Sequence, residues 1–130
     1  MMLTVESLPR LKQALMADAV VSGATGLLMI LAAGFLADLL DIPEGLLRYA
    51  GWVLAPYVAF VVYSATRRPI SLAGVWIVIS ANVLWAVASL LLLVSGWITP
   101  NALGTGFVLL QALVVSAFAA VQVAVLRKLR

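Results

Sequence analysis

The sequence predicts an all-α integral membrane protein, a bundle of four transmembrane helices that form two antiparallel hairpins. The first observation is a run of 58 uncharged residues, 69–126. Because a hydrocarbon core of about 30 Å needs about 20 helical residues, this run is long enough for two spans and a turn. The second observation is a pair of shorter uncharged runs, 19–37 and 49–66, each about one membrane thickness long.

Composition supports the same class of protein. Of the 130 residues, 65% are hydrophobic and 10% are charged, and the mean hydropathy is +1.20. These values are typical of integral membrane proteins, and we expect one transmembrane domain over residues 1–130. The chain has no cysteine and no histidine, which removes thiolate and imidazole ligands. We therefore expect no metal site and no cofactor.

The expected spans follow in order along the chain. The first runs from about 16 to 39, and it ends where acidic residues, Pro43 and Gly45 interrupt the apolar pattern. The second runs from about 46 to 65, before a tight turn at residues 67–69, because proline disfavours a helical residue before it. The third runs from about 71 to 96 and the fourth from about 102 to 125, with a short connection around Pro100.

The cations predict how the bundle is oriented. Seven of the eight lie in segments that an even number of spans places on one side: Arg10, Lys12, Arg67, Arg68, Arg127, Lys128 and Arg130. The other side has Arg48 with three acidic residues. By the positive-inside rule, both termini are expected in the cytoplasm, and the protein is expected in the inner (plasma) membrane as a multi-pass protein. The net charge of +3 therefore requires no nucleic-acid partner.

Asp18 invites one comparison with a known family. In length and four-helix layout the chain is similar to small multidrug-type exporters, in which a buried carboxylate of the first helix exchanges protons for cations. However, 19 uncharged residues follow Asp18 before Asp38. These residues already fill the hydrocarbon core, so Asp18 is expected at the membrane edge. There its negative charge would interact favourably with the positive, N-terminal end of the helix dipole.

Two amides are the most polar side chains expected deep in the membrane, Asn82 and Gln111. Each must face protein or water, because an unpaired amide in hydrocarbon is costly. Counted from the turn at residues 67–69, Asn82 is level with Tyr57 and Pro56. Counted from the turn near Ile98, Gln111 and Asn82 differ in depth, so Gln111 is better placed against Ser89. These five residues are either interhelical hydrogen-bonding groups or the lining of a pathway.

Small residues recur at four-residue spacing on three spans. On the last span they predict a helix-packing ridge, which consists of Ala112, Ser116, Ala120 and Ala124. Membrane helices gain by close approach through such residues. The other two ridges consist of Ala19, Gly23 and Gly26 on the first span and Gly51, Ala55 and Ala59 on the second, and we expect these ridges to pack within the chain.

Three functions are compatible with this pattern. The leading one is a non-catalytic bundle that associates with itself, as a homo-oligomer, or with a larger membrane complex. The alternative is a small oligomeric transporter or channel with a pathway near Asn82 and Gln111, and the second alternative is a lipid or hydrophobic-cofactor binder. The sequence lacks catalytic motifs, so we do not expect an enzyme. A water-accessible cavity that reaches Asn82 or Gln111 would favour a pathway, and a dry, packed bundle would argue against one.

Overall fold

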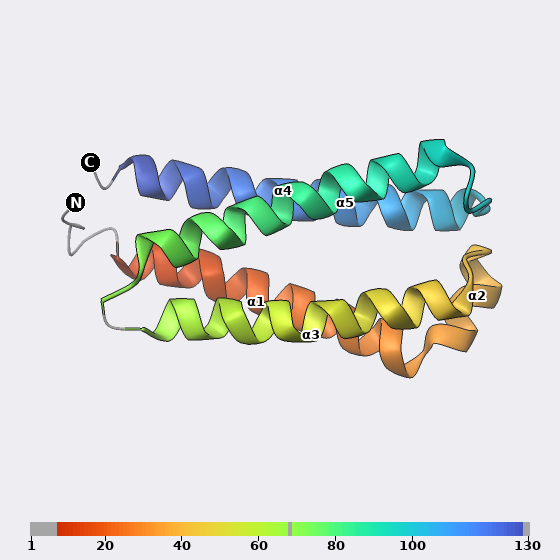
Figure 1. Cartoon of the computed structure of the whole chain (residues 1–130), viewed down its shortest axis with the longest axis horizontal. Helices are drawn as coiled ribbons and strands as arrows, with labels where there is room; N and C mark the ends of the chain where they lie inside the picture. Colours follow the sequence, from red (N-terminus) through yellow and green to blue (C-terminus); the bar gives the residue numbers. More distant parts are fainter. Residues whose placement is uncertain (1–7, 68, 129–130) are drawn as a thin grey trace.

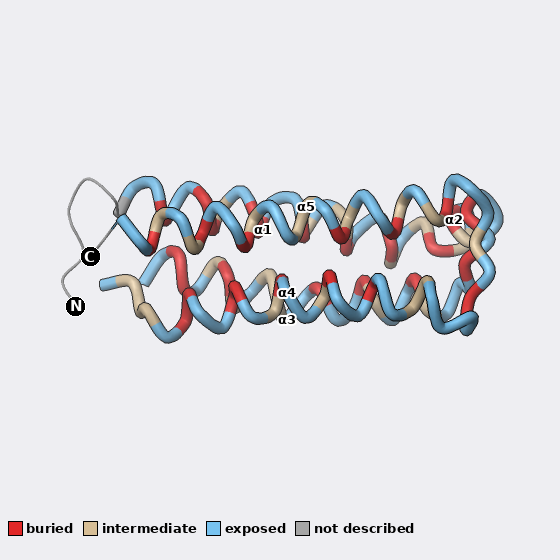
Figure 2. The backbone as a smooth tube through the Cα atoms, turned by 90° about the horizontal axis from the view of Figure 1, so that it is seen from above, coloured by how far each residue is buried: buried red, intermediate tan, exposed pale blue. Residues whose placement is uncertain are grey.

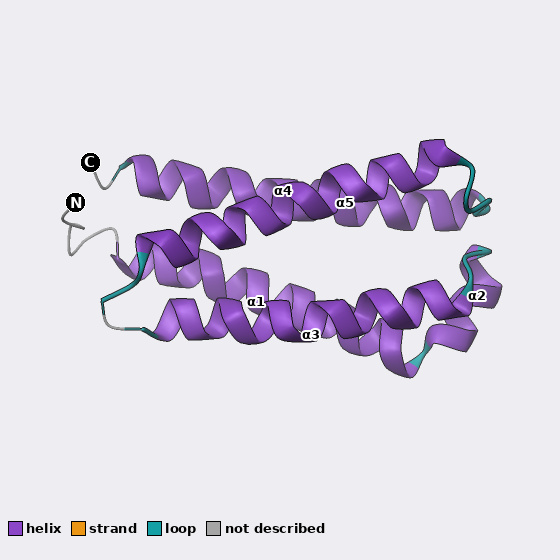
Figure 3. Cartoon of the chain, in the orientation of Figure 1, coloured by secondary structure: helices purple, strands orange, loops and turns teal. Residues whose placement is uncertain are grey.

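The computed structural model describes residues 8–67 and 69–128, and these residues form helices joined by short connections (Figures 1 and 3). In order, the helices are α1 (Leu8–Leu31), α2 (Ala33–Leu40), α3 (Glu44–Thr66), α4 (Leu72–Ser95) and α5 (Ala102–Arg127). All but α2 are long and apolar enough to cross a membrane. The structure thus supports the predicted all-α membrane bundle.

The last three expected spans coincide with α3, α4 and α5 to within two residues. The first differs, because α1 begins at Leu8 and ends at Leu31, and α2 follows it after a bend at Ala32. The hydrogen bonding continues through the bend: the Ala32 N–H donates to the carbonyl of Leu28, and the Ala32 carbonyl accepts from Leu36. The early start of α1 places Asp18 ten residues inside the helix.

Two antiparallel hairpins make up the bundle, with α1 packed mainly on α3 and α4 packed mainly on α5 (Figure 1). The backbones of α1 and α3 come closest at Gly26 and Gly51. A Cβ atom added to Gly51 would lie 2.8 Å from the Gly26 carbonyl oxygen, so a side chain at Gly51 would force the helices apart. Gly26 and Gly51 therefore pack as expected, whereas Ala55 and Ala59 of the same predicted ridge are exposed.

Charge is separated along the bundle. The beginning of α1, the connection between α3 and α4, and the end of α5 lie at one end (Figure 1). This basic end carries Arg10, Lys12, Arg67, Arg127 and Lys128. The opposite end carries Asp38, Asp41 and a Glu44–Arg48 ion pair of 3.0 Å. Arg68 and Arg130 lie outside the described residues.

Asn101 joins the two hairpins at the opposite end. Its side-chain oxygen accepts the Gly104 N–H at 2.8 Å and so caps α5. Its side-chain nitrogen donates to the Leu39 carbonyl at 2.9 Å, and its backbone N–H donates to the Leu40 carbonyl. A Cβ atom at Gly104 would collide with the same Leu40 carbonyl, so only glycine allows this contact.

Buried residues face the interior of the bundle and exposed residues face outward (Figure 2). The outward surface is apolar, with large side chains such as Leu31, Val94 and Leu84 exposed. The interior contains two hydrophobic clusters, one near the basic end around Val61, Val75 and Val78 and one toward the opposite end around Met29, Leu36 and Val108. An apolar outer surface is what lipid contact requires.

Candidate functional site: a buried carboxylate between the hairpins

Asp18 lies in the centre of the bundle, which corrects its expected place at the membrane edge. Its side chain is completely buried. Ten residues separate it from the start of α1, which is about 15 Å along the helix axis. Counting uncharged residues misplaced it, because α1 begins ahead of Arg10 and Lys12, whose long side chains can reach outward from the first turns.

All four long helices contribute a hydrogen-bond donor to this carboxylate. Oδ2 of Asp18 accepts from the Tyr57 hydroxyl of α3 at 2.8 Å, from the Asn82 amide of α4 at 2.9 Å and from the Gln122 amide of α5 at 2.9 Å. Oδ1 accepts from the Ser22 hydroxyl, one turn along α1, at 3.0 Å. We call these five residues the Asp18 cluster.

The donors of the Asp18 cluster suit an ionised carboxylate. An ionised carboxylate is an acceptor only, with about four lone-pair positions. It meets two amide N–H groups and two hydroxyls, all of them neutral. Hydrogen bonds of this kind are stronger than those between neutral groups, and they offset part of the cost of burying the charge.

The Tyr57 hydroxyl has two acceptors and one proton. It lies 2.8 Å from Asp18 Oδ2 and 3.0 Å from Asn82 Oδ1. The Asn82 amide nitrogen also lies 3.4 Å from the Gln122 side-chain oxygen, so the two amides are linked to each other as well as to the carboxylate. The Asp18 cluster is therefore a connected network and not a set of separate pairs.

Three of the cavities formed by the described residues lie between the hairpins and share residues with one another. The largest, about 340 Å³, includes Ile42 and Ile98 near the opposite end and reaches Gln111. A second, of about 220 Å³, extends from Gln111 to Ser22. The third, of about 170 Å³, is lined by Ser22, Tyr57 and Asn82 of the Asp18 cluster.

Trp85 lines all three cavities. Its indole N–H donates to the Gln111 side-chain oxygen at 3.3 Å, which fixes the ring between α4 and α5. Apart from these polar groups, the walls are mainly aliphatic and aromatic, with Met29, Leu54 and Phe107 among them. The cavities thus form an apolar series that ends at the polar partners of Asp18.

The residues predicted from the sequence are found in different places. Tyr57 and Asn82 meet at the expected level, with the hydrogen bond given above. Gln111 lies apart from Asn82, as expected, but its partner is Trp85. Ser89 instead donates to the Trp85 carbonyl of its own helix at 2.7 Å, although it shares a cavity with Gln111. Pro56 is exposed and lies outside the Asp18 cluster.

The expected helix-packing ridge is divided. Ala112 is buried against the rest of the bundle, whereas Ser116, Ala120 and Ala124 are exposed. The residues that α5 buries recur at spacings of three to seven residues, and they are Gly104, Val108, Ala112, Ala119, Gln122 and Leu126. A strict four-residue step turns away from this face by about 40° per step, so the ridge leaves the interior after its first residue.

Sequence reasoning missed Gln122, Ser22 and Trp85, and it misplaced Asp18. A signal for two of them was available. Ser22 follows Asp18 by four residues, so both lie on one helix face. Gln122 follows Gln111 by 11 residues, which is about three helical turns and again one face. No protein-family model, curated protein or solved structure matches this chain.

Proposed function

We propose that this protein is a small membrane transporter whose pathway runs between the two hairpins to the Asp18 cluster. The observation that carries the proposal is the series of three cavities that reaches Gln111 and then Asn82. Hairpins held together only by packing would need no such space. A buried ionisable residue within a membrane is itself a common mark of a transport pathway.

The chemistry of the cavities favours one class of solute. Their walls are mainly apolar and aromatic, and they end at Ser22, Tyr57 and Asn82, whose side chains donate hydrogen bonds to Asp18. A small apolar molecule that carries a positive charge fits this arrangement, because its apolar part fills the cavity and its charge is attracted to the carboxylate. Asp18 would be the counter-ion, and Trp85 would contact the cation through its ring face.

Binding of a defined apolar cation tests the proposal. Tetraphenylphosphonium should bind to the purified protein in detergent, whereas the neutral triphenylphosphine oxide should bind at least about tenfold more weakly. Asp18→Asn keeps the size of the side chain and should abolish this preference while the helical content stays the same. Asp38→Asn, at the opposite end, is the matched control. Equal binding of both compounds would contradict the proposed solute class.

Water access provides a test that does not depend on the solute. The chain has no native cysteine. Ala81 lines the cavity beside Asn82, whereas Leu84, one turn away, is 68% exposed on the outer surface. A small water-soluble thiol reagent should label the Ala81→Cys variant in vesicles and leave the Leu84→Cys variant unlabelled. Absence of labelling at both positions would indicate a dry bundle without a pathway.

We propose that the protein lies in the inner (plasma) membrane and that its basic end faces the cytoplasm. An impermeant thiol reagent added outside should label the Thr99→Cys variant, whereas the Arg67→Cys variant should be protected. The reverse pattern would overturn the orientation.

We also propose that the protein is not an enzyme, since the Asp18 cluster pairs its carboxylate with amides and hydroxyls and with no activated nucleophile.

Self-association and assembly into a larger membrane complex stay predictions. Three residues of the expected ridge, Ser116, Ala120 and Ala124, lie on the outer face of α5 and line a groove with α4. They are therefore free to contact something other than this chain. The chemistry of the groove suggests what that is.

A further inference from the structure

The outer face of the second hairpin has an open groove between α4 and α5, separate from the three interior cavities. Its volume is about 820 Å³. Its walls are apolar, with Ile79, Val83 and Leu90 on one side and Ala120 on the other. At one end, the groove is lined by Arg127 and Lys128, which belong to the basic end of the bundle.

The length of the groove matches one leaflet of a bilayer. Along α5, its lining from Ser116 to Arg127 covers 11 helical steps, or about 16 Å. Half of a hydrocarbon core of about 30 Å is about 15 Å. If Arg127 and Lys128 lie at the level of the lipid headgroups, the apolar part of the groove ends near the middle of the membrane.

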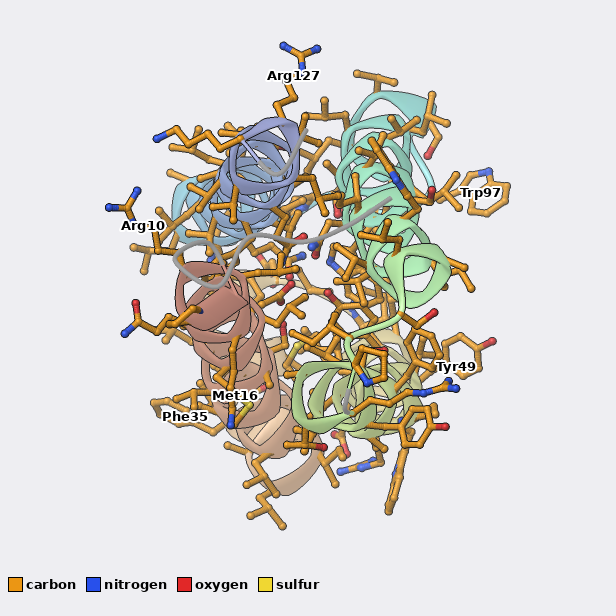
Figure 4. The ribbon with its side chains drawn as sticks, turned by 90° about the vertical axis from the view of Figure 1, so that its left-hand side faces the viewer. Arg10, Met16, Phe35, Tyr49, Trp97 and Arg127 are labelled. Carbon is orange, nitrogen blue, oxygen red and sulfur yellow. The ribbon has the colours of Figure 1, made fainter. Side chains whose placement is uncertain are left out.

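Charge favours an anionic headgroup at the basic end of the groove. Arg127 extends away from the bundle at the edge formed by α4 and α5 (Figure 4). The acids within the described ranges lie elsewhere, with Asp18 buried in its cluster and Asp38, Asp41 and Glu44 at the opposite end. Basic pockets between transmembrane helices bind anionic lipid headgroups in this way.

A second copy of the chain fits the groove less well. Two copies inserted in the same direction would be related by a twofold axis along the membrane normal. That symmetry brings Arg127 and Lys128 of both chains to the same level at one interface, where like charges repel. The same two cations attract a phosphate, so the groove discriminates against a copy and in favour of a lipid.

We propose that this groove binds an anionic phospholipid, with one acyl chain along α4 and α5 and the phosphate held by Arg127 and Lys128. The binding site is distinct from the proposed transport pathway and does not depend on it. It would hold a lipid of the same leaflet as the basic end.

Native mass spectrometry of the purified protein tests this proposal with phosphatidylglycerol and phosphatidylcholine of identical acyl chains. Two cations near the headgroup should favour phosphatidylglycerol by roughly 10- to 30-fold. The double variant Arg127→Gln, Lys128→Gln should lose this preference. The double variant Arg10→Gln, Lys12→Gln removes the same charge from the same end and should keep it.

A second pair of variants tests the acyl-chain part. Ala120→Phe places a ring in the groove and should reduce retention of both lipids, whereas Ala59→Phe, at an exposed position of α3, should not. Equal retention of the two lipids by the unmodified protein would overturn the proposal. A dimer that Ala120→Phe dissociates would also overturn it, because a second copy would then be the occupant.

Discussion

The two halves of the bundle differ in how tightly and by which groups they are packed. Toward the basic end, Val61, Val75 and Val78 are completely buried beside the Asp18 cluster. Within the described residues, every buried side-chain nitrogen and oxygen has a hydrogen-bond partner. Toward the opposite end, the interior is almost entirely apolar and contains the cavity of about 340 Å³.

The difference follows from the solvent. In water, closing a gap between apolar surfaces would lower the free energy. In lipid, packing Leu against Leu lowers the free energy little more than packing Leu against an acyl chain. Hydrogen bonding between polar groups lowers the free energy more, because without a partner these groups would be unsatisfied in hydrocarbon. Polar groups therefore hold the hairpins together where Asp18, Asn82 and Gln122 meet and, at the opposite end, at Asn101, and the apolar interior between these two places is left free to contain space.

We expect the largest effect on stability from Asp18→Leu. It removes the acceptor shared by Tyr57, Asn82 and Gln122, and we expect a loss of about 2–4 kcal/mol in the free energy of unfolding. Unfolding in mixed detergent micelles measures it. Asp38→Leu, at an exposed position of α2, should change stability by less than about 0.5 kcal/mol. If both variants were equally mild, the Asp18 cluster would not be what joins the hairpins.

A matched pair of valines compares packing in the two halves. Val78 is 0% exposed near the Asp18 cluster, and Val108 is 4% exposed but lines the cavity of about 340 Å³. Val78→Ala should cost about 1–2 kcal/mol, and Val108→Ala roughly half as much, because Val108 already has empty space beside it. Thermal denaturation in detergent measures both. A larger loss from Val108→Ala would mean that the cavity half is the better packed one.

The smallest effect is expected at the hydrogen bond between Trp85 and Gln111. Gln111→Leu removes an interhelical hydrogen bond worth about 0.6 kcal/mol, and Gln13→Leu, at an exposed position of α1, is the control. The fluorescence of Trp85 should change in a variant whose Trp52, Trp76 and Trp97 are phenylalanine. An unchanged spectrum would show that Gln111 does not hold the ring.

Most of the fold was predictable because hydrophobic length determines where membrane helices lie. The bounds of α3, α4 and α5 were predicted closely, since charged residues, prolines or polar turns limit each of them. The bounds of the first span were not, because Arg10 and Lys12 occupy the first turns of α1 and a count of uncharged residues excludes them. The bend at Ala32 has no marker of this kind in the sequence.

The site was predictable only in part. Counting turns placed Asn82 beside Tyr57 because both are measured from the same short connection. It did not bring Asp18 to them, since that requires the position of the first helix relative to the others. The partner of Gln111 depended on which way Trp85 points, and a side-chain direction of this kind cannot be obtained from spacing alone.

The single proton of Tyr57 gives the Asp18 cluster two hydrogen-bonded forms with one arrangement of heavy atoms. In one form the hydroxyl donates to Asp18 Oδ2, 2.8 Å away, and in the other it donates to Asn82 Oδ1, 3.0 Å away. The number of donors that the buried carboxylate accepts can thus change by rotation of one hydroxyl, without moving a helix.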